Sequence, residues 1–385
     1  MPAIAYFDNA ATTFPKPESV YTYMDSYYRS YGVNVGRGQN KLAYKATGMI
    51  DETRQLLLKL FYCQNKKIVF SPSSTEALNV LIQGQEYFDG CNIYISPFEH
   101  NSVTRVLHHL ESQYKIKVHQ LSVDRKTLSY DAEKIRTQFL KNKPNFVMVS
   151  HASNVCGLIA PIEMICSLAK QYEATTIVDM SQTAGLINTD LSSNDIDFAV
   201  FAGHKTLYGP FGISGFITKD SKLPKPLIYG GTGIESANQD LPAQLPARFE
   251  AGSVNVAALA GLNASLKWIS EIGISELFKK EQINHQRLIE TLSAHSNIQI
   301  IGSENARQSI GIVSCVFDGY SPDSIGQVLS ENNVATRTGL HCSPFAHKFL
   351  GTFPAGTVRF SASYFTTEDD FVQLNGALDF IEENS

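Results

Sequence analysis

The chain has 385 residues and a formal net charge of −5, with 43% hydrophobic and 18% charged residues. This length is ample for a large core and suggests two domains of a soluble globular protein. With a negative net charge, the chain has no overall positive field that would attract nucleic acid or anionic membranes. It also lacks an apolar run of about 18 residues, so we expect no membrane span.

The N-terminus and the cysteines give two further expectations. Residues 1–8 lack the basic start and long apolar core of a signal peptide, so we expect a cytoplasmic protein. The six cysteines, at positions 63, 91, 156, 166, 315 and 342, have neither C-x-x-C nor zinc-finger spacing. We therefore expect no metal site, and cytoplasmic cysteines would stay reduced.

Short apolar runs alternate with helix-like segments between about residues 60 and 220. Several runs are rich in Val and Ile on both faces, which is typical of strands buried between two layers of helices. The alternation predicts an α/β fold with a mostly parallel seven-stranded sheet, whose ligands bind beyond the carboxyl ends of the strands. The predicted strands are 67–70, 92–96, 116–120, 145–150, 175–179, 196–201 and 215–218.

Residues 219–256 interrupt this pattern with four prolines and the run Gly230-Gly-Thr-Gly233. An irregular segment of this length inside a globular protein is usually functional. After it, the pattern predicts helices at 256–272, 275–292, 322–332 and 367–381, and strands at 310–317 and 357–361.

Two domains are predicted from this organisation. We expect a large domain over residues 16–258 and a smaller α+β domain over residues 259–385, which also takes in the N-terminal segment 1–15.

Lys205 is the most informative residue of the chain. It lies in a loop flanked by Gly and Pro after the predicted strand 196–201, and Asp179 ends the predicted strand 175–179. A lysine and a carboxylate at the same edge of a sheet suit pyridoxal phosphate. The lysine would form a Schiff base with the cofactor aldehyde, and the carboxylate would keep the pyridine nitrogen protonated.

A seat for the cofactor phosphate is predicted where the strand 67–70 leads into a helix. Ser73 and Glu76 have capping-box spacing, which by itself indicates only a helix cap. Beside a cofactor-binding lysine we favour a phosphate seat formed by the helix N-terminus and the hydroxyls of Ser74 and Thr75. His204 could donate to the same phosphate, and the segment 203–206 lacks the spaced glycines of a Walker motif.

Three more polar residues follow predicted strands. His100 could stack on a planar cofactor, although a lone histidine is more often a structural hydrogen-bonding residue. Asn154 is either a turn residue or an amide offered to a substrate carboxylate or a cofactor oxygen. Gln182, three residues after Asp179, could bond the ring oxygen of the cofactor.

Cys342 and Arg359 are the candidates for chemistry in the C-terminal part. Cys342 lies among Gly and Pro, beside His341 and near Arg337, so it is either a reactive thiol or a packing residue in a turn. Arg359 lies inside an apolar strand, and burying its charge requires an anion. A substrate α-carboxylate, held by two parallel hydrogen bonds, is a natural one.

Together these segments resemble the class V aminotransferase family and, within it, the cysteine desulfurases. The resemblance covers nearly the whole chain, and the matching segments occur in the family's order. They are Asp8-Asn-Ala-Ala-Thr-Thr13, Ser74-Thr-Glu-Ala-Leu-Asn79, Glu99-His100, Ser153-Asn154, Val178-Asp-Met-Ser-Gln182, Gly203-His-Lys205, Phe249-Glu-Ala-Gly-Ser253, Arg337-Thr-Gly-x-His-Cys342 and Arg359.

The resemblance implies a fold-type I pyridoxal phosphate enzyme that works as a homodimer. It implies that Lys205 is the Schiff-base lysine, Asp179 the pyridine partner and His100 the ring-stacking histidine. The other cofactor ligands would be Gln182, Ser74, Thr75, His204 and, lent to the neighbouring subunit, Ser253. The substrate-binding residues would be Ala11, Asn154, Arg337 and Arg359.

The implied reaction converts L-cysteine to L-alanine and leaves a persulfide on Cys342, from which a protein could accept the sulfur. Lys205 would remove the Cα proton, His100 would shuttle a proton, and His341 is one candidate source of positive charge beside the thiol. The alternatives are selenocysteine lyase, aminotransferase or epimerase chemistry, and a weakly active partner or scaffold in sulfur trafficking. A nucleotide-binding protein is disfavoured, because the phosphate signals match neither a Walker nor a Rossmann pattern.

Overall fold

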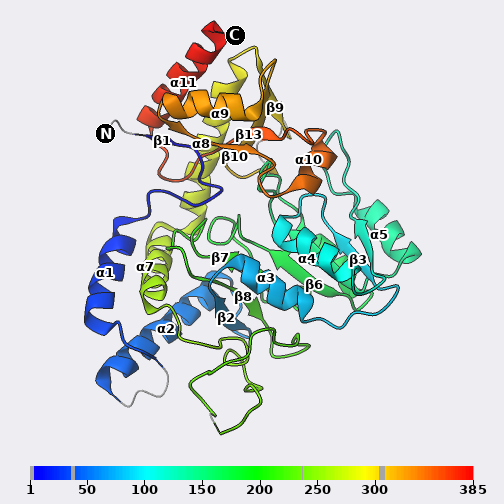
Figure 1. The fold of residues 1–385 in the computed structure, drawn as a ribbon, viewed down its shortest axis with the longest axis vertical. Coiled ribbons are helices and arrows are strands. Elements are labelled where there is room, and N and C mark those ends of the chain that lie inside the picture. Colours follow the sequence, from blue (N-terminus) through cyan, green and yellow to red (C-terminus); the bar gives the residue numbers. More distant parts are fainter. Residues whose placement is uncertain (1–3, 36–39, 236, 303–307, 385) are drawn as a thin grey trace.

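The computed structural model describes residues 4–35, 40–235, 237–302 and 308–384. A large and a small sheet lie in different parts of the molecule, and α8 (Ile274–Ser293) runs from the large part into the small one (Figure 1). The other helices are α1 (Glu18–Tyr31), α2 (Lys41–Leu60), α3 (Ser74–Gln83), α4 (Asn101–Glu111), α5 (Ala132–Lys141), α6 (Ile162–Lys170), α7 (Val256–Ile272), α9 (Pro322–Glu331), α10 (Pro344–Leu350) and α11 (Glu368–Glu383).

Within the described residues, seven strands form the large sheet in the order β2-β8-β7-β6-β5-β3-β4. Neighbours from β7 to β4 are parallel, and β8 runs antiparallel to both of its neighbours. The strands are β2 (Lys67–Ser71), β3 (Asn92–Ile95), β4 (Lys117–Gln120), β5 (Phe146–Ser150), β6 (Thr175–Asp179), β7 (Phe198–Ala202) and β8 (Ser214–Thr218). The predicted α/β fold with a mostly parallel seven-stranded sheet is confirmed.

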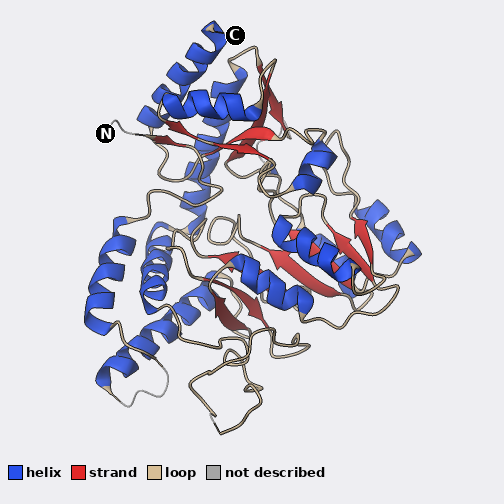
Figure 2. Cartoon of the chain, in the orientation of Figure 1, coloured by secondary structure: helices blue, strands red, loops and turns tan. Residues whose placement is uncertain are grey.

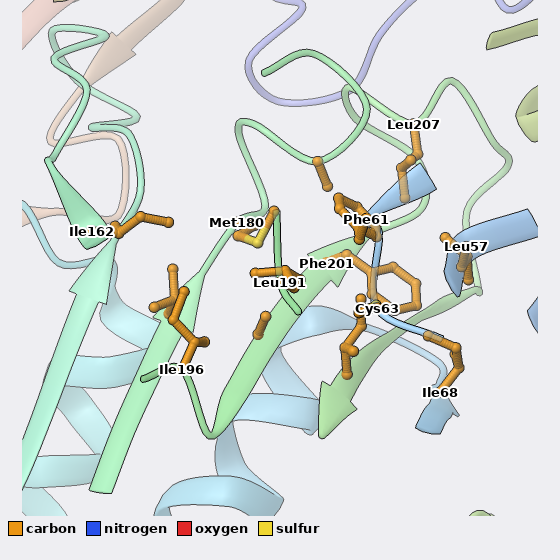
Figure 3. Close-up of a cluster of buried hydrophobic side chains, with 14 of the residues drawn as sticks. Leu57, Phe61, Cys63, Ile68, Ile162, Met180, Leu191, Ile196, Phe201 and Leu207 are labelled. Atoms are coloured by element: carbon orange, nitrogen blue, oxygen red, sulfur yellow. The ribbon is translucent and has the colours of Figure 1, made fainter. Parts of the chain in front are cut away.

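Helices cover both faces of the large sheet because side chains along each strand alternate between two apolar clusters. Phe146 and Met148 of β5 pack with α3 and α4 on one face. Val147 and Val149 point to the other face, where α2, α5, α6 and α7 pack. Figure 3 shows part of this second cluster, with Phe201 of β7 among residues from α2 and the loops. Coverage on both faces explains the apolar runs in the sequence.

A second sheet contains four antiparallel strands in the order β12-β13-β10-β9. They are β9 (Ile298–Ile301), β10 (Ile312–Phe317), β12 (Arg337–Gly339) and β13 (Thr357–Ser361). The start of the chain belongs to the same part, because β1 (Ala5–Tyr6) pairs with β11 (Val334–Ala335) and Phe7 joins the cluster formed by this sheet with α8, α9 and α11. The smaller α+β part is therefore present as predicted.

Helix ends follow local sequence signals. The Thr367 side chain accepts from the backbone N–H of Asp370, and the Asp370 carboxylate accepts from that of Thr367, which completes the predicted N-cap of α11. The predicted domain boundary between residues 258 and 259 falls inside α7, whose apolar side chains pack on the large sheet. That boundary stays a prediction.

The segment between β8 and α7 contains neither helix nor strand among its described residues, and Ser236 lies outside them. It extends as irregular coil from the large part of the molecule (Figure 2). Ile228 and Tyr229 are exposed there. In the described part of the chain, helices with the length and apolar character needed to cross a bilayer are absent.

Candidate active site

A polar pocket lies at the carboxyl ends of the parallel strands. Asp179 is the last residue of β6, Lys205 follows β7, and Ser74 begins the helix after β2. Because parallel strands end at the same edge of a sheet, these residues meet. The lining residues are Ser74, His100, Ser102, Ser150, Ala152, Asn154, Asp179, Ser181, Gln182 and Lys205. Six of the predicted site residues are therefore brought together here.

Lys205 is half-buried in the pocket, and Asp179, Arg359 and Arg337 are the charges that act on its amine. The pKa of its amine is lowered to about 8, mainly by burial; Asp179 opposes this shift, and Arg359 and Arg337 add to it. The N-terminal segment holds the lysine backbone: Thr13 Oγ1 donates to the Lys205 carbonyl at 3.0 Å. An amine with this pKa loses its proton more readily than an exposed lysine, as a nucleophile or base requires.

Asp179 is held in place by Ser181. The Ser181 backbone N–H and hydroxyl both donate to Asp179 Oδ1, at 2.9 and 2.5 Å. Among the described residues, these bonds leave Asp179 Oδ2 for another partner, and a protonated ring nitrogen is a group it could accept from.

His100 has the structural hydrogen-bonding role that the sequence left open, and its stacking on a cofactor stays a prediction. It is the N-cap of α4, where its Nδ1 accepts from the Ser102 N–H at 3.0 Å, and it also lines the pocket. Burial, together with the charge of Lys205, lowers its pKa to about 4. The imidazole is therefore neutral, with its proton on Nε2 because Nδ1 is an acceptor.

The predicted phosphate ligands are only partly brought together. Ser74 lines the pocket. The Ser73 hydroxyl accepts from the Glu76 N–H at 3.1 Å, so the chain itself forms the helix cap indicated by the sequence. Burial lowers the pKa of His204 to about 3, its ring stacks on Phe211, and its Nδ1 is buried without a partner among the described residues. Ser253 is exposed and is not among the pocket residues.

The amides of Asn154 and Gln182 already bind the protein. Asn154 Nδ2 donates to the His341 carbonyl at 2.7 Å, and its Oδ1 accepts from the Ser343 hydroxyl at 2.7 Å. Gln182 Nε2 donates to the Ala10 carbonyl at 2.9 Å, next to Ala11. Asn154 thus fixes the turn that carries Cys342, whatever else it binds.

Arg359 has an anion partner that the sequence analysis did not identify. Its Nη2 lies 2.7 Å from Asp8 Oδ1, and its Nη1 donates to the Asn154 carbonyl at 3.0 Å. Its Nε is buried without a hydrogen-bond partner among the described residues. Asp8 therefore satisfies the charge of the buried guanidinium, and the Nε–H can donate to a further carboxylate oxygen. Arg337 is its strand neighbour on β12.

Cys342 is exposed, whereas the other five cysteines are buried. His341 and Cys342 both have left-handed backbone, with φ of 47° and 58°. The Cys342 carbonyl accepts from the Asn101 N–H at 2.7 Å, which seats this turn on the first residue of α4, beside His100. The thiolate of Cys342 would raise the pKa of Lys205 and of Arg359.

His341 was one candidate source of positive charge beside the thiol, and it does not supply that charge. It is buried, Arg359 and Arg337 are nearby, and its pKa is lowered to about 2. Its Nε2 lies 2.8 Å from the Thr357 hydroxyl. A neutral imidazole in this position is a structural group, and the expectation was wrong because the burial of His341 could not be read from its neighbours in sequence.

Glu99 was matched to a family motif without a role. It is buried, and its carboxylate accepts from the Ser96 hydroxyl at 2.5 Å and from the Ser150 N–H and hydroxyl at 2.7 and 2.8 Å. Burial raises its pKa to about 7. Glu99 thus joins the loop carrying His100 to the end of β5, and a glutamate directly before a candidate histidine was the available signal.

The chain matches the Aminotransferase class-V family over residues 5–374. It therefore belongs to this family of pyridoxal phosphate-dependent enzymes.

Within this family, the chain is similar to relatives and to a solved structure that are named cysteine desulfurases. A probable cysteine desulfurase of Pyrococcus abyssi is 32% identical over 98% of this chain and 94% of its own length. A cysteine desulfurase of Synechococcus elongatus is 30% identical over 99% of this chain and 61% of its own length. The apo structure of cysteine desulfurase from Thermococcus onnurineus has a TM-score of 0.91 and 28% identity, covering 99% of this chain and 95% of that one.

Proposed function

We propose that this protein is a pyridoxal phosphate-dependent cysteine desulfurase that converts L-cysteine to L-alanine and takes the sulfur on Cys342. One observation carries the proposal: the exposed Cys342 turn is seated on the N-terminus of α4, whose cap is His100, a residue of the Lys205–Asp179 pocket. The Lys205 amine and the Asp179 carboxylate line this pocket, and Cys342 lines a second hollow together with Asn101, the first residue of α4. The cysteine desulfurase names of the relatives support the same activity.

The residues of the pocket fit the cofactor. Lys205 offers an amine of lowered pKa and Asp179 an anchored carboxylate, while His204, next to Lys205 in the chain, offers a buried nitrogen without a partner among the described residues. Ser74, Thr75 and His204 would hold the phosphate, and His100 and Gln182 would contact the ring. When bound, the cofactor supplies an electron sink for charge that develops at the substrate Cα.

The chain's own residues would do the remaining work. Arg359 would hold the substrate α-carboxylate, with Asn154, Arg337 and Ala11 beside it. The Lys205 amine would take the Cα proton and return one later, and neutral His100 would relay a proton through its Nε2. Cys342, as thiolate, would attack the substrate sulfur: an S–S bond forms, the C–S bond breaks, and its electron pair stays with the carbon fragment.

The assembly is part of the proposal. The resemblance to the class V family implies that Ser253 binds the cofactor phosphate of a second copy in a homodimer, and its exposed position outside the pocket of its own chain supports this assignment. The exposed position of Cys342 suits transfer of the persulfide sulfur to a protein acceptor in the cytoplasm.

Purified protein with pyridoxal phosphate and a thiol reductant should release alanine and sulfide from L-cysteine in equal amounts. The two products are measured in the same samples over time. Keto-acid-dependent amino transfer without sulfide would instead indicate an aminotransferase, and loss of chirality at Cα without sulfide an epimerase. Either result would refute the desulfurase assignment.

Substitution of Arg359 by lysine should raise KM for L-cysteine by roughly tenfold to a hundredfold with a smaller change in kcat. The positive charge is kept, but a charge-assisted hydrogen bond worth about 1.5–3 kcal/mol is lost. Steady-state kinetics with L-cysteine test this. Cysteamine, which lacks the carboxylate, is the matched substrate: its kcat/KM should change little, and an equal loss for both substrates would contradict the assigned role.

A further inference from the structure

Ser253 lies at the end of the long irregular segment between β8 and α7, seen in Figure 1 below the large sheet. A hydroxyl on such a segment binds a ligand well only if the backbone before it is fixed. Gly252 has a φ of 98°, and its N–H donates to the Gly231 carbonyl at 2.8 Å, but this bond lies within the segment itself. The connection to the rigid part of the fold comes from Glu250.

Glu250 attaches the segment to the large sheet through both carboxylate oxygens. Its Oε2 lies 2.6 Å from Arg54 Nη2 of α2, and its Oε1 accepts from the Phe70 N–H of β2 at 2.7 Å. Only 17% of the Arg54 and 10% of the Glu250 side chain is exposed. The Arg54 guanidinium also lies over the Phe70 ring, 4.9 Å from its centroid.

The position of Phe70 explains why a carboxylate is needed there. β2 is the edge strand of the large sheet, so it has a strand partner, β8, on one side only. A carboxylate oxygen takes the place of a missing strand for the Phe70 N–H. Since Phe70 is three residues before Ser73, the contact lies directly before the phosphate seat at the start of α3.

We propose that Glu250, held by Arg54 and by the Phe70 N–H, is a positioning residue that sets Ser253 for the cofactor phosphate of a second copy of the chain. This inference depends on the proposed function, because it assigns Ser253 to that phosphate. Glu250 is not among the residues that line the pocket, so it would touch neither cofactor nor substrate there. It acts through Ala251 and Gly252, the two residues that separate it from Ser253.

The test compares affinity for pyridoxal phosphate with affinity for pyridoxal, which lacks the phosphate. Dissociation constants are measured by titrating apoprotein and following the absorbance of the lysine-bound cofactor. Glu250→Gln should weaken pyridoxal phosphate binding about tenfold, as expected for loss of a hydrogen bond to a charged group, with a change below about twofold for pyridoxal. Arg54→Lys should act in the same direction.

Two further variants make the test specific. In a Ser253→Ala background, Glu250→Gln should have little additional effect, since its effect passes through Ser253. Asp51→Asn is the control: Asp51 also contacts Arg54, at 3.3 Å, but 65% of its side chain is exposed, so binding should not change.

Three results would overturn the inference. They are equal weakening of pyridoxal and pyridoxal phosphate binding, an additive effect of Glu250→Gln in the Ser253→Ala background, and conversion of the Glu250→Gln protein to monomers in light scattering. Failure of the proposed function is distinct: the wild type would then develop no absorbance with pyridoxal phosphate, or Lys205→Ala would develop the same absorbance.

Discussion

Replacement of Lys205 by alanine is expected to lower alanine formation from L-cysteine by about a thousandfold or more and to remove the visible absorbance of the cofactor-bound protein. The substitution removes both the covalent link to the cofactor and the base at the Cα proton, and general acid–base catalysis alone contributes about 10²–10⁴-fold. Initial rates and the absorption spectrum of the same preparation measure the two effects.

The control for this variant is Lys267→Ala, on α7. Lys267 is half-exposed and pairs with Glu52 outside the pocket, so activity and absorbance should persist. Apo Lys205→Ala should unfold at a temperature no lower than that of the apo wild type, because burial already disfavours the charged amine. Wild-type activity in Lys205→Ala would remove the basis of the proposed function.

Replacement of Cys342 by alanine should reduce alanine and sulfide release to the level of Lys205→Ala while leaving the cofactor absorbance intact. The thiolate is the proposed acceptor of the substrate sulfur, and without it the C–S bond has no nucleophile to break it. Loss of turnover with retained cofactor absorbance would distinguish the role of Cys342 from that of Lys205, whose substitution should remove both. Cys342→Ser tests the same point with nearly the same side-chain volume.

Alkylation provides an independent check on Cys342. Iodoacetamide should inactivate the wild type with incorporation at Cys342, because this cysteine is exposed and the other five are buried. The Cys342→Ala protein should take up little label under the same conditions. If alanine production were indifferent to both the substitution and the alkylation, Cys342 would be structural and another class V activity would have to be assigned.

Sequence patterns predicted the parts of the site that depend on strand ends. Buried parallel strands have apolar runs of limited length, so the positions of β6 and β7 could be read from the sequence. Since β6 and β7 were predicted to be parallel strands, Asp179 at the end of β6 and Lys205 after β7 had to lie at the same edge of the sheet. His100 is similar: it follows β3, and its cap position keeps it at the mouth of the pocket.

Contacts between distant segments could not be predicted in this way. Nothing local indicates that Arg359 pairs with Asp8, that Glu250 reaches Arg54, or that His341 is buried and neutral. β12 has three residues and α10 has seven, and their positions depend on the packing of the small sheet. Burial and charge partners decide what these groups do, and both are properties of the folded chain.

The contacts between the first residues and the last strand also determine when this part of the fold can form during synthesis. Asp8 is joined to Arg359 and Asn9 to Ser361, across 351 and 352 positions of the chain. At about 5–20 residues per second, a ribosome needs roughly 20–70 s to make the residues between them. The N-terminal segment thus leaves the ribosome long before its partners exist, and the Asp8–Arg359 ion pair can form only when the chain is nearly complete.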